Sequence, residues 1–354
     1  MMRSRWLDTA RRGRRRAVTP AAMVAGAAVL AGLGLAACGQ RSAHGSAGTT
    51  AAADPTLAAV VGSSSNGSSS QIKLISPQTG RVAKVVAGGT SNGLAISADA
   101  KSVYVVRAAG HVIQIRQISV ATGKISVVAH GACPAVSPDG RYLAYATGGR
   151  FSKVAVRDLN TGRVRMIELA SLLGNDGNLL NQGQVTWLGD GNELIVVPGI
   201  SASEAAADVT AGAGTVASAQ QPPGRQNLIV IRLRPDGLTA RQIVVPDPYQ
   251  QPFPVVSGDM SQKRAVLIAS VGYAGAGTIS RVSLHGKGYQ AQVIAKLPRG
   301  ATPIGFAPGG DRVLYLVGHR PPQLYVAAIT DGRLSGKQRL VTDTSSFGVD
   351  QAAW

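Results

Sequence analysis

A pattern of apolar runs separated by turns rich in Asp and Gly repeats along this chain. In each copy an apolar position is followed by a short polar turn and then by a run of β-forming residues. The copies start about 50 residues apart, at Ile96, Val136, Trp187, Val256, Phe306 and, for its first strand only, Trp354. Asp-Gly and Pro-Asp-Gly turns are typical of hairpins, because these residues tolerate positive φ angles. Each copy therefore predicts a pair of antiparallel strands.

A second type of hairpin alternates with the first. Strand-like runs lead into a Thr-Gly, Asp-Gly or Lys-Gly turn, and another strand-like run follows each turn. These runs with their turns cover residues 72–80, 113–123, 154–162, 228–237, 279–288 and 324–332. Two hairpins per repeat make a four-stranded sheet, and a radial arrangement of such sheets protects their edges. The chain is therefore predicted to be all-β, folded as a six-bladed β-propeller with four-stranded blades.

The two ends of the repeat region complement each other. Residues 351–354 align with Gln184–Trp187, and residues 57–62 resemble the run that should follow the missing turn. We therefore expect the N- and C-terminal strands to share one blade and to close the ring. A β-sandwich or two smaller β domains would not require a fixed repeat or complementary ends. The fourth repeat is the longest, and its segment from about 200 to 226 is interpreted as an insertion rather than a degenerate extra blade.

One turn carries a family signature. Ser137-Pro138-Asp139-Gly140 matches in full the Ser-Pro-Asp-Gly turn of TolB-type propeller repeats, and the other copies keep one to three of its positions. Residues 57–354 thus resemble that WD-repeat-like family. The resemblance implies a propeller fold, but this architecture is shared by binding scaffolds and enzymes alike.

The N-terminal segment has the pattern of a secretion signal. A basic stretch is followed by an uncharged stretch over residues 17–37 and by Leu35-Ala36-Ala37-Cys38. This arrangement resembles a bacterial lipoprotein signal, which implies cleavage before Cys38 and lipidation of that cysteine. The predicted parts are then a signal peptide over 1–37, a flexible Ser/Ala/Gly/Thr-rich tether over 38–56 and the propeller over 57–354.

An uncleaved transmembrane anchor is the alternative, because residues 17–37 reach the roughly 20 residues needed to span a bilayer. In both interpretations the arginines stay in the cytoplasm, and the propeller is expected on the extracytoplasmic face of the cell membrane. Either the Sec or the twin-arginine route fits this signal. The abundance of Ala, Gly and Arg is compatible with an actinobacterial source.

The chain is strongly basic, with a formal net charge of +18. Cleavage before Cys38 would leave 29 basic and 17 acidic residues, a net charge of +12. Such a surface is attracted to anionic lipids and wall polymers, and the expected partner is an envelope protein or a cell-wall glycan. Nucleic acid is not expected in this compartment. Cys133 would be the second cysteine, and a lone cysteine is more often a buried apolar group than a reactive thiol.

The sequence shows no recognisable catalytic set. The five histidines lack metal-site spacing, many acidic residues lie in the repeat turns, and no Gly-x-Ser-x-Gly motif is present. No cofactor or metal is therefore expected. Aligning the repeats places polar residues where each innermost strand begins, around one mouth of the central channel. These residues are Ser91, Asn92, Cys133, Gln182, Gln184, Gln251, Thr302, Asp350 and Gln351.

This ring predicts a ligand or partner site, and a water-filled channel lining without a partner is the alternative. The sequence therefore favours a monomeric, lipid-anchored, non-enzymatic binding or scaffold module. A propeller hydrolase or lactonase with its site at the channel mouth remains the second hypothesis.

Overall fold

The computed structural model describes most of the repeat region. The described residues are 57–63, 71–88, 93–169, 172, 184–189, 191–197, 224–247, 255–258, 265–271, 277–284, 289, 291–307, 310–318, 323–330, 333–340 and 347–354. The predicted signal peptide and tether lie outside these ranges. Within them, no helix has the length and apolar character that crossing a membrane requires.

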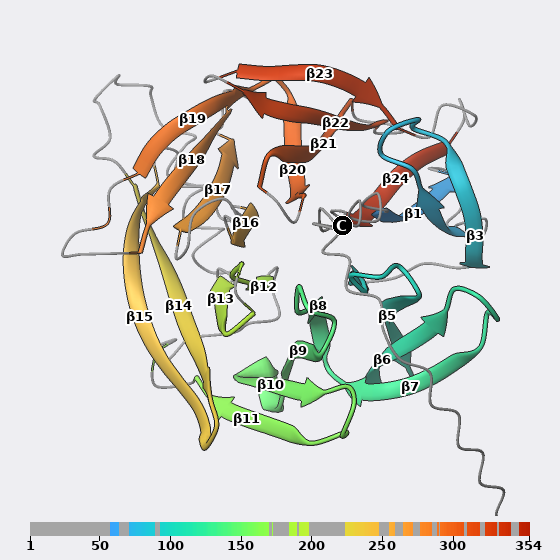
Figure 1. Ribbon diagram of the computed structural model, residues 1–354, viewed down its shortest axis with the longest axis vertical. Coiled ribbons are helices and arrows are strands. Elements are labelled where there is room, and N and C mark those ends of the chain that lie inside the picture. Colours follow the sequence, from blue (N-terminus) through green and yellow to red (C-terminus); the bar gives the residue numbers. More distant parts are fainter. Residues whose placement is uncertain are drawn as a thin grey trace, which may run out of the picture. The chain divides into compact units, whose positions relative to one another are not determined.

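Six four-stranded antiparallel sheets form a ring, which confirms the predicted six-bladed β-propeller (Figure 1). Blades 1 to 3, each from the innermost strand outward, are β24 (Phe347–Ala353), β1 (Leu57–Ser63), β2 (Gln71–Ile75), β3 (Val82–Gly88); β4 (Leu94–Ile96), β5 (Ser102–Ala109), β6 (Val112–Ser119), β7 (Ile125–His130); and β8 (Ala132–Val136), β9 (Tyr142–Thr147), β10 (Lys153–Asp158), β11 (Val164–Glu168).

Blades 4 to 6 follow the same order. Their strands are β12 (Gln184–Trp187), β13 (Glu193–Val197), β14 (Gly224–Arg234), β15 (Gly237–Asp247); β16 (Val255–Gly258), β17 (Ala265–Val271), β18 (Gly277–Ser283), β19 (Ala291–Leu297); and β20 (Ala301–Phe306), β21 (Arg312–Val317), β22 (Gln323–Thr330), β23 (Arg333–Arg339). A 3-10 turn, η1 (Gly149–Phe151), lies between β9 and β10.

The ring closes as the complementary ends predict. β24 pairs antiparallel with β1, in a register that runs from Ala58 opposite Ala353 to Ser63 opposite Phe347. The last strand of the chain is thus the innermost strand of the blade that contains the first. Closure gives β1 a hydrogen-bonded partner along its inner edge, which is how propellers limit the exposure of strand edges.

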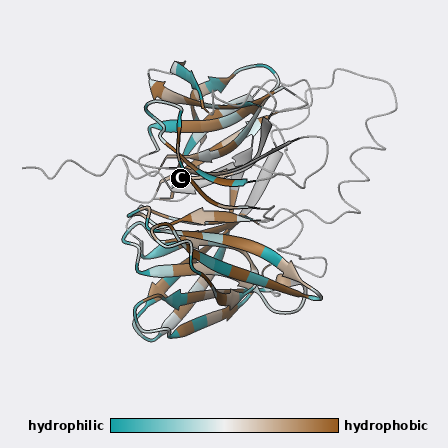
Figure 2. Ribbon diagram, turned by 90° about the vertical axis from the view of Figure 1, so that its right-hand side faces the viewer, coloured by the Kyte–Doolittle hydropathy of each residue, from teal (hydrophilic) through white to brown (hydrophobic). Residues whose placement is uncertain are grey.

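The core consists of apolar layers between neighbouring blades. Ile229 and Ile231 of blade 4 pack with residues of blade 3, whereas Val230 between them packs with residues of blade 5. Successive side chains of a strand point to opposite faces, so each blade supplies two layers. Figure 2 shows the resulting alternation of brown and teal segments along the strands.

The repeated turn residues act through their side chains. In the β4–β5 turn the Ser97 hydroxyl donates to Asp99 Oδ1 over 2.7 Å, and Asp99 Oδ1 accepts the Lys101 amide over 3.1 Å. These hydrogen bonds, with that from Ser97 first, lower the pKa of Asp99. In the β8–β9 turn Asp139 Oδ1 accepts the Ser137 hydroxyl and the Arg141 amide in the same way. The Ser-x-Asp pattern is thus explained by turn formation.

Strand β14 marks the C-terminal end of the predicted insertion. The insertion was expected over about 200–226, but β14 begins at Gly224 and pairs with β15 from its first residue. The long β14–β15 hairpin extends the strand pattern further toward the N-terminus than the apolar run 228–233 indicates. Residues 200–223, the rest of the predicted insertion, lie outside the described residues.

Candidate functional site at the channel mouth

Each blade contributes the residues of its innermost strand to the wall of the central channel. β4, β8, β12, β16, β20 and β24 contact one another in this cyclic order around the centre of the ring. Every blade follows the same inner-to-outer strand order, so the innermost strands all begin on the same face of the domain. We call this face the channel mouth.

Three of the expected mouth residues have described side chains. Cys133 is the second residue of β8, Gln184 is the first of β12 and Thr302 is the second of β20. Gln184 is half-buried and Thr302 is exposed. β8 and β12 are neighbours in the ring, so Cys133 and Gln184 belong to adjacent blades. Gln184 and Thr302 therefore give the mouth neutral hydrogen-bonding groups.

The other expected residues are only partly described. Asp350 and Gln351 lie in the middle of β24, which begins at Phe347, and their side chains are not described. They are therefore further along their strand than Gln184 is along β12. The remaining four, Ser91, Asn92, Gln182 and Gln251, lie outside the described residues, as does the lipidation candidate Cys38.

The backbone around Cys133 departs from regular strand geometry. The β8–β9 register shifts between Ala132 and Ala135, and Cys133 in this bulge has φ 52°. A positive φ is uncommon for a residue with a β-carbon. The bulge turns the half-buried Cys133 side chain toward the apolar layer between blades 3 and 4. Bulges often re-aim a side chain at the rim of a closed sheet.

The Cys133 thiol is suited to packing rather than to nucleophilic chemistry. Burial raises its pKa from about 9 to about 11. The thiolate is the nucleophilic form, so the neutral thiol dominates at physiological pH. Within the described ranges, no three His, Cys, Asp or Glu side chains are grouped as a metal site would need.

The raised pKa predicts slow alkylation of Cys133. At pH 8 iodoacetamide should modify it about a hundredfold more slowly in the folded chain than in urea, because two pKa units separate the thiolate populations. Raising the pH toward 11 should restore reactivity in the folded chain. Peptide mass spectrometry in a Cys38→Ser background measures both rates, and equal rates at pH 8 would contradict the burial of this thiol.

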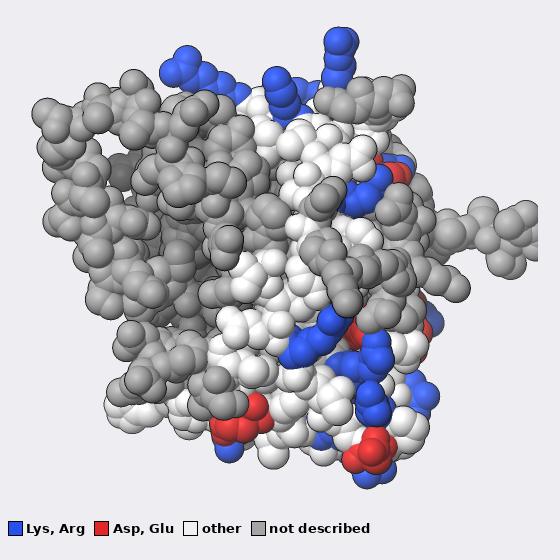
Figure 3. Space-filling model, turned by 90° about the vertical axis from the view of Figure 1, so that its left-hand side faces the viewer, with Lys and Arg blue, Asp and Glu red and all other residues white. Residues whose placement is uncertain are grey.

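A hollow that the sequence did not predict lies in blade 4. It has a volume of about 360 Å³ and is lined by Glu193, Val230, Arg232, Arg234, Thr239, Ala240 and Arg241. Figure 3 shows basic side chains spread over this side of the ring and acidic ones at fewer places. The sequence signal was the alternation of Arg232 and Arg234 along one strand, but only the pairing with β15 adds Thr239 and Arg241 to the same face.

Comparison with known proteins supports the fold alone. No family model matches the chain, and no curated protein matches it in sequence. Among solved structures, TolB from Acinetobacter baumannii is similar with a TM-score of 0.58 and 15% identity, over 85% of this chain and 66% of TolB. This chain thus matches just under two thirds of TolB. A chain in a nidogen/laminin complex gives a TM-score of 0.53 and 11% identity, over 84% of this chain and 97% of that one.

A third match is a protein of Bacteroides fragilis NCTC 9343 provisionally named a 6-phosphogluconolactonase, with a TM-score of 0.43 and 14% identity, over 82% of this chain and 96% of that one. The similarity to TolB and to the chain of the nidogen/laminin complex indicates a shared β-propeller fold. The matches assign no activity to this chain.

Proposed function

We propose that this chain is a lipid-anchored, extracytoplasmic β-propeller that acts as a non-enzymatic binding or scaffold module. The observation that carries the proposal is the closed ring, in which the starts of six innermost strands converge on one mouth. A rigid ring of this kind holds recognition groups from several blades in fixed positions, which lowers the entropy cost of binding. The N-terminal pattern ending at Cys38 supports the location at the membrane.

The chemistry of the described mouth residues favours recognition over catalysis. The amide of Gln184 and the hydroxyl of Thr302 donate and accept hydrogen bonds without changing charge at physiological pH. The Cys133 thiol has a raised pKa and packs against the core. The partner we propose is an envelope protein, with a cell-wall glycan as the second choice because of the strong positive charge.

Crosslinking from membranes tests the mouth as the binding site. The wild-type chain should capture one protein at fixed stoichiometry, and a variant with Gln184, Gln251 and Asp350 all changed to Ala should lose it. A matched control changes Gln242, Gln292 and Asp236 to Ala, which are exposed residues on outer strands and their turn. The control should retain the partner, because it removes the same groups away from the mouth.

The remaining outcomes decide between the alternatives. Loss of the partner in both triple variants would place the contact outside the mouth and contradict its proposed role. If no protein is captured, binding to purified cell walls that depends on the same three residues would favour a glycan ligand. Turnover of a lactone or ester that the mouth variant abolishes, with unfolding unchanged, would replace the scaffold by the hydrolase or lactonase hypothesis.

Membrane attachment has its own prediction. Cys38→Ser should release the folded domain from the membrane fraction, because the substitution removes the sulfur that would carry the lipid. Fractionation followed by immunoblotting measures the release, and Cys133→Ser is the matched control that should stay with membranes. If the Cys38→Ser chain remains in the membrane fraction through an uncleaved N-terminus, the transmembrane-anchor alternative is correct.

A further inference from the structure

The register of one hairpin gathers the arginines of the hollow in blade 4. β14 and β15 pair with Arg232 opposite Thr239 and Val230 opposite Arg241. Because alternate residues share a face, Arg234 and these four side chains lie on one side of the hairpin. Their neighbours Ile229 and Ile231 fill the layer against blade 3, so the arginine side turns toward blade 5.

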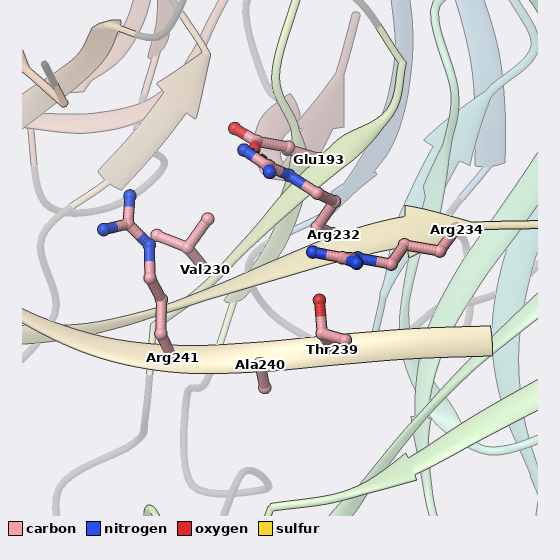
Figure 4. Close-up of a pocket in the computed structure, with 7 residues that line it drawn as sticks. All are labelled: Glu193, Val230, Arg232, Arg234, Thr239, Ala240 and Arg241. Carbon is pink, nitrogen blue, oxygen red and sulfur yellow. Dashed lines mark hydrogen bonds and ion pairs between the residues drawn. The ribbon is translucent and has the colours of Figure 1, made fainter. Parts of the chain in front are cut away.

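Figure 4 shows how these side chains surround the hollow. Arg232, Arg234 and Thr239 lie along one part of it, and Arg241 lies beyond Val230. Arg241 also reaches toward blade 5, where its Nη1 donates to the hydroxyl of Tyr289 over 3.4 Å. Arg241 thus links the hollow to blade 5, whereas the described residues that line the hollow itself all belong to strands of blade 4.

The charges of this hollow are unbalanced. Glu193 is 4% exposed and accepts hydrogen bonds from Arg232, with 2.7 Å between Arg232 Nε and Glu193 Oε1. Glu193 is the single acidic residue of the described lining, which contains three arginines. Like charges on neighbouring positions of a sheet face repel each other. A bound anion would relieve this repulsion.

We propose that this hollow is a second binding site, for a phosphate group of a small ligand or polymer. Guanidinium groups form paired hydrogen bonds with phosphate oxygens. Several arginines together can bind more oxygen atoms than the two of a carboxylate, which favours a phosphate group as the ligand. The Thr239 hydroxyl adds a neutral donor. A volume of about 360 Å³ fits a phosphate with a small organic group attached.

This site is separate from the channel mouth. β12 runs from the mouth to Trp187, and Glu193 begins the next strand at the far end of the blade. Arg234 ends β14 and is paired with Gly237 at the hairpin turn on that same far end. The proposal therefore does not depend on the function proposed for the mouth.

Calorimetric titration of the full-length chain in a non-ionic detergent tests the site. The probes are inorganic phosphate, glycerol 3-phosphate as a monoester, glycerophosphoglycerol as a diester of the kind found in anionic lipids, and acetate as a carboxylate. We expect saturable binding of at least one phosphate probe, tighter than that of acetate. Arg234→Gln with Arg241→Gln should weaken it roughly tenfold or more, and Arg333→Gln, an exposed arginine of blade 6, should not.

The outcomes are distinguishable. Preference for inorganic phosphate or the monoester indicates a soluble ligand, and preference for the diester indicates a lipid headgroup or wall polymer. Arg234→Lys with Arg241→Lys keeps the charge, so binding between wild type and the Gln variant would support guanidinium recognition. No saturable binding of any phosphate probe, or equal weakening by Arg333→Gln, would overturn the proposal in favour of nonspecific attraction to a basic surface. Thermal unfolding of each variant shows that a loss is not caused by misfolding.

Discussion

Deleting residues 349–354 should abolish cooperative folding of the propeller. The deletion removes most of β24, whose pairing with β1 closes the ring. It also removes Ala352 and Trp354, which pack against the apolar layer of Leu314 and Leu324 in blade 6 and Ala59 in blade 1. The loss of an inner strand and this packing should cost about 5 kcal/mol or more, comparable to the whole stability of many domains.

Thermal unfolding followed by circular dichroism, with size-exclusion chromatography, measures this effect. The truncated chain should show a broad or missing transition and elute as aggregates, because the open edge of β1 can pair with other chains. Removing residues 41–46 of the predicted tether deletes the same length of chain and should leave unfolding unchanged. A truncated chain that unfolds at the wild-type temperature would show that the β24–β1 pairing is not what closes the domain.

The fold could be predicted from the sequence because the residues that form each turn lie next to one another in the chain. Ser97 with Asp99, and Ser137 with Asp139, make the same hydrogen bonds in two different blades. A turn that is specified by residues two positions apart leaves a periodic signal in the sequence. Ring closure was also predictable, because the missing strand at one end was present at the other.

The candidate sites were harder to predict from the sequence than the fold, because they depend on the register between strands and on the path of the chain from one strand to the next. Arg232, Thr239 and Arg241 lie on two strands, and only the β14–β15 register places them on one face. The alignment of repeats placed Cys133 and Gln184 in innermost strands, where the structure has them. It did not indicate the bulge that turns Cys133 toward the core, because β8 consists of small or apolar residues and has no alternation in which an extra residue would show.

Gly131, between β7 and β8, lies so close to β9 that there is no space for a side chain at this position. Gly131 joins β7 to β8 just ahead of the Cys133 bulge, and its amide donates to the Ile113 carbonyl over 3.0 Å. A β-carbon at this position would lie 2.2 Å from the Ala146 carbonyl oxygen and 2.9 Å from Cδ2 of Tyr145. The first obstacle is backbone of the paired strand β9, so it cannot move away as a flexible side chain would.

Gly131→Ala should therefore destabilise the domain by about 3 kcal/mol or more. The clash with Ala146 can be relieved only if β8 moves away from its partner strand β9 or shifts within the channel wall. Gly123→Ala, in a turn with φ 70° and open space around it, should cost about 1 kcal/mol for its backbone conformation alone. Gly88→Ala, where a β-carbon meets nothing within 4 Å, should change stability by less than about 0.5 kcal/mol. Urea unfolding of the three variants measures this order. If Gly131→Ala were no more destabilising than Gly123→Ala, β7 would have to enter β8 by a wider path, and the position of Cys133 at the channel mouth would change with it.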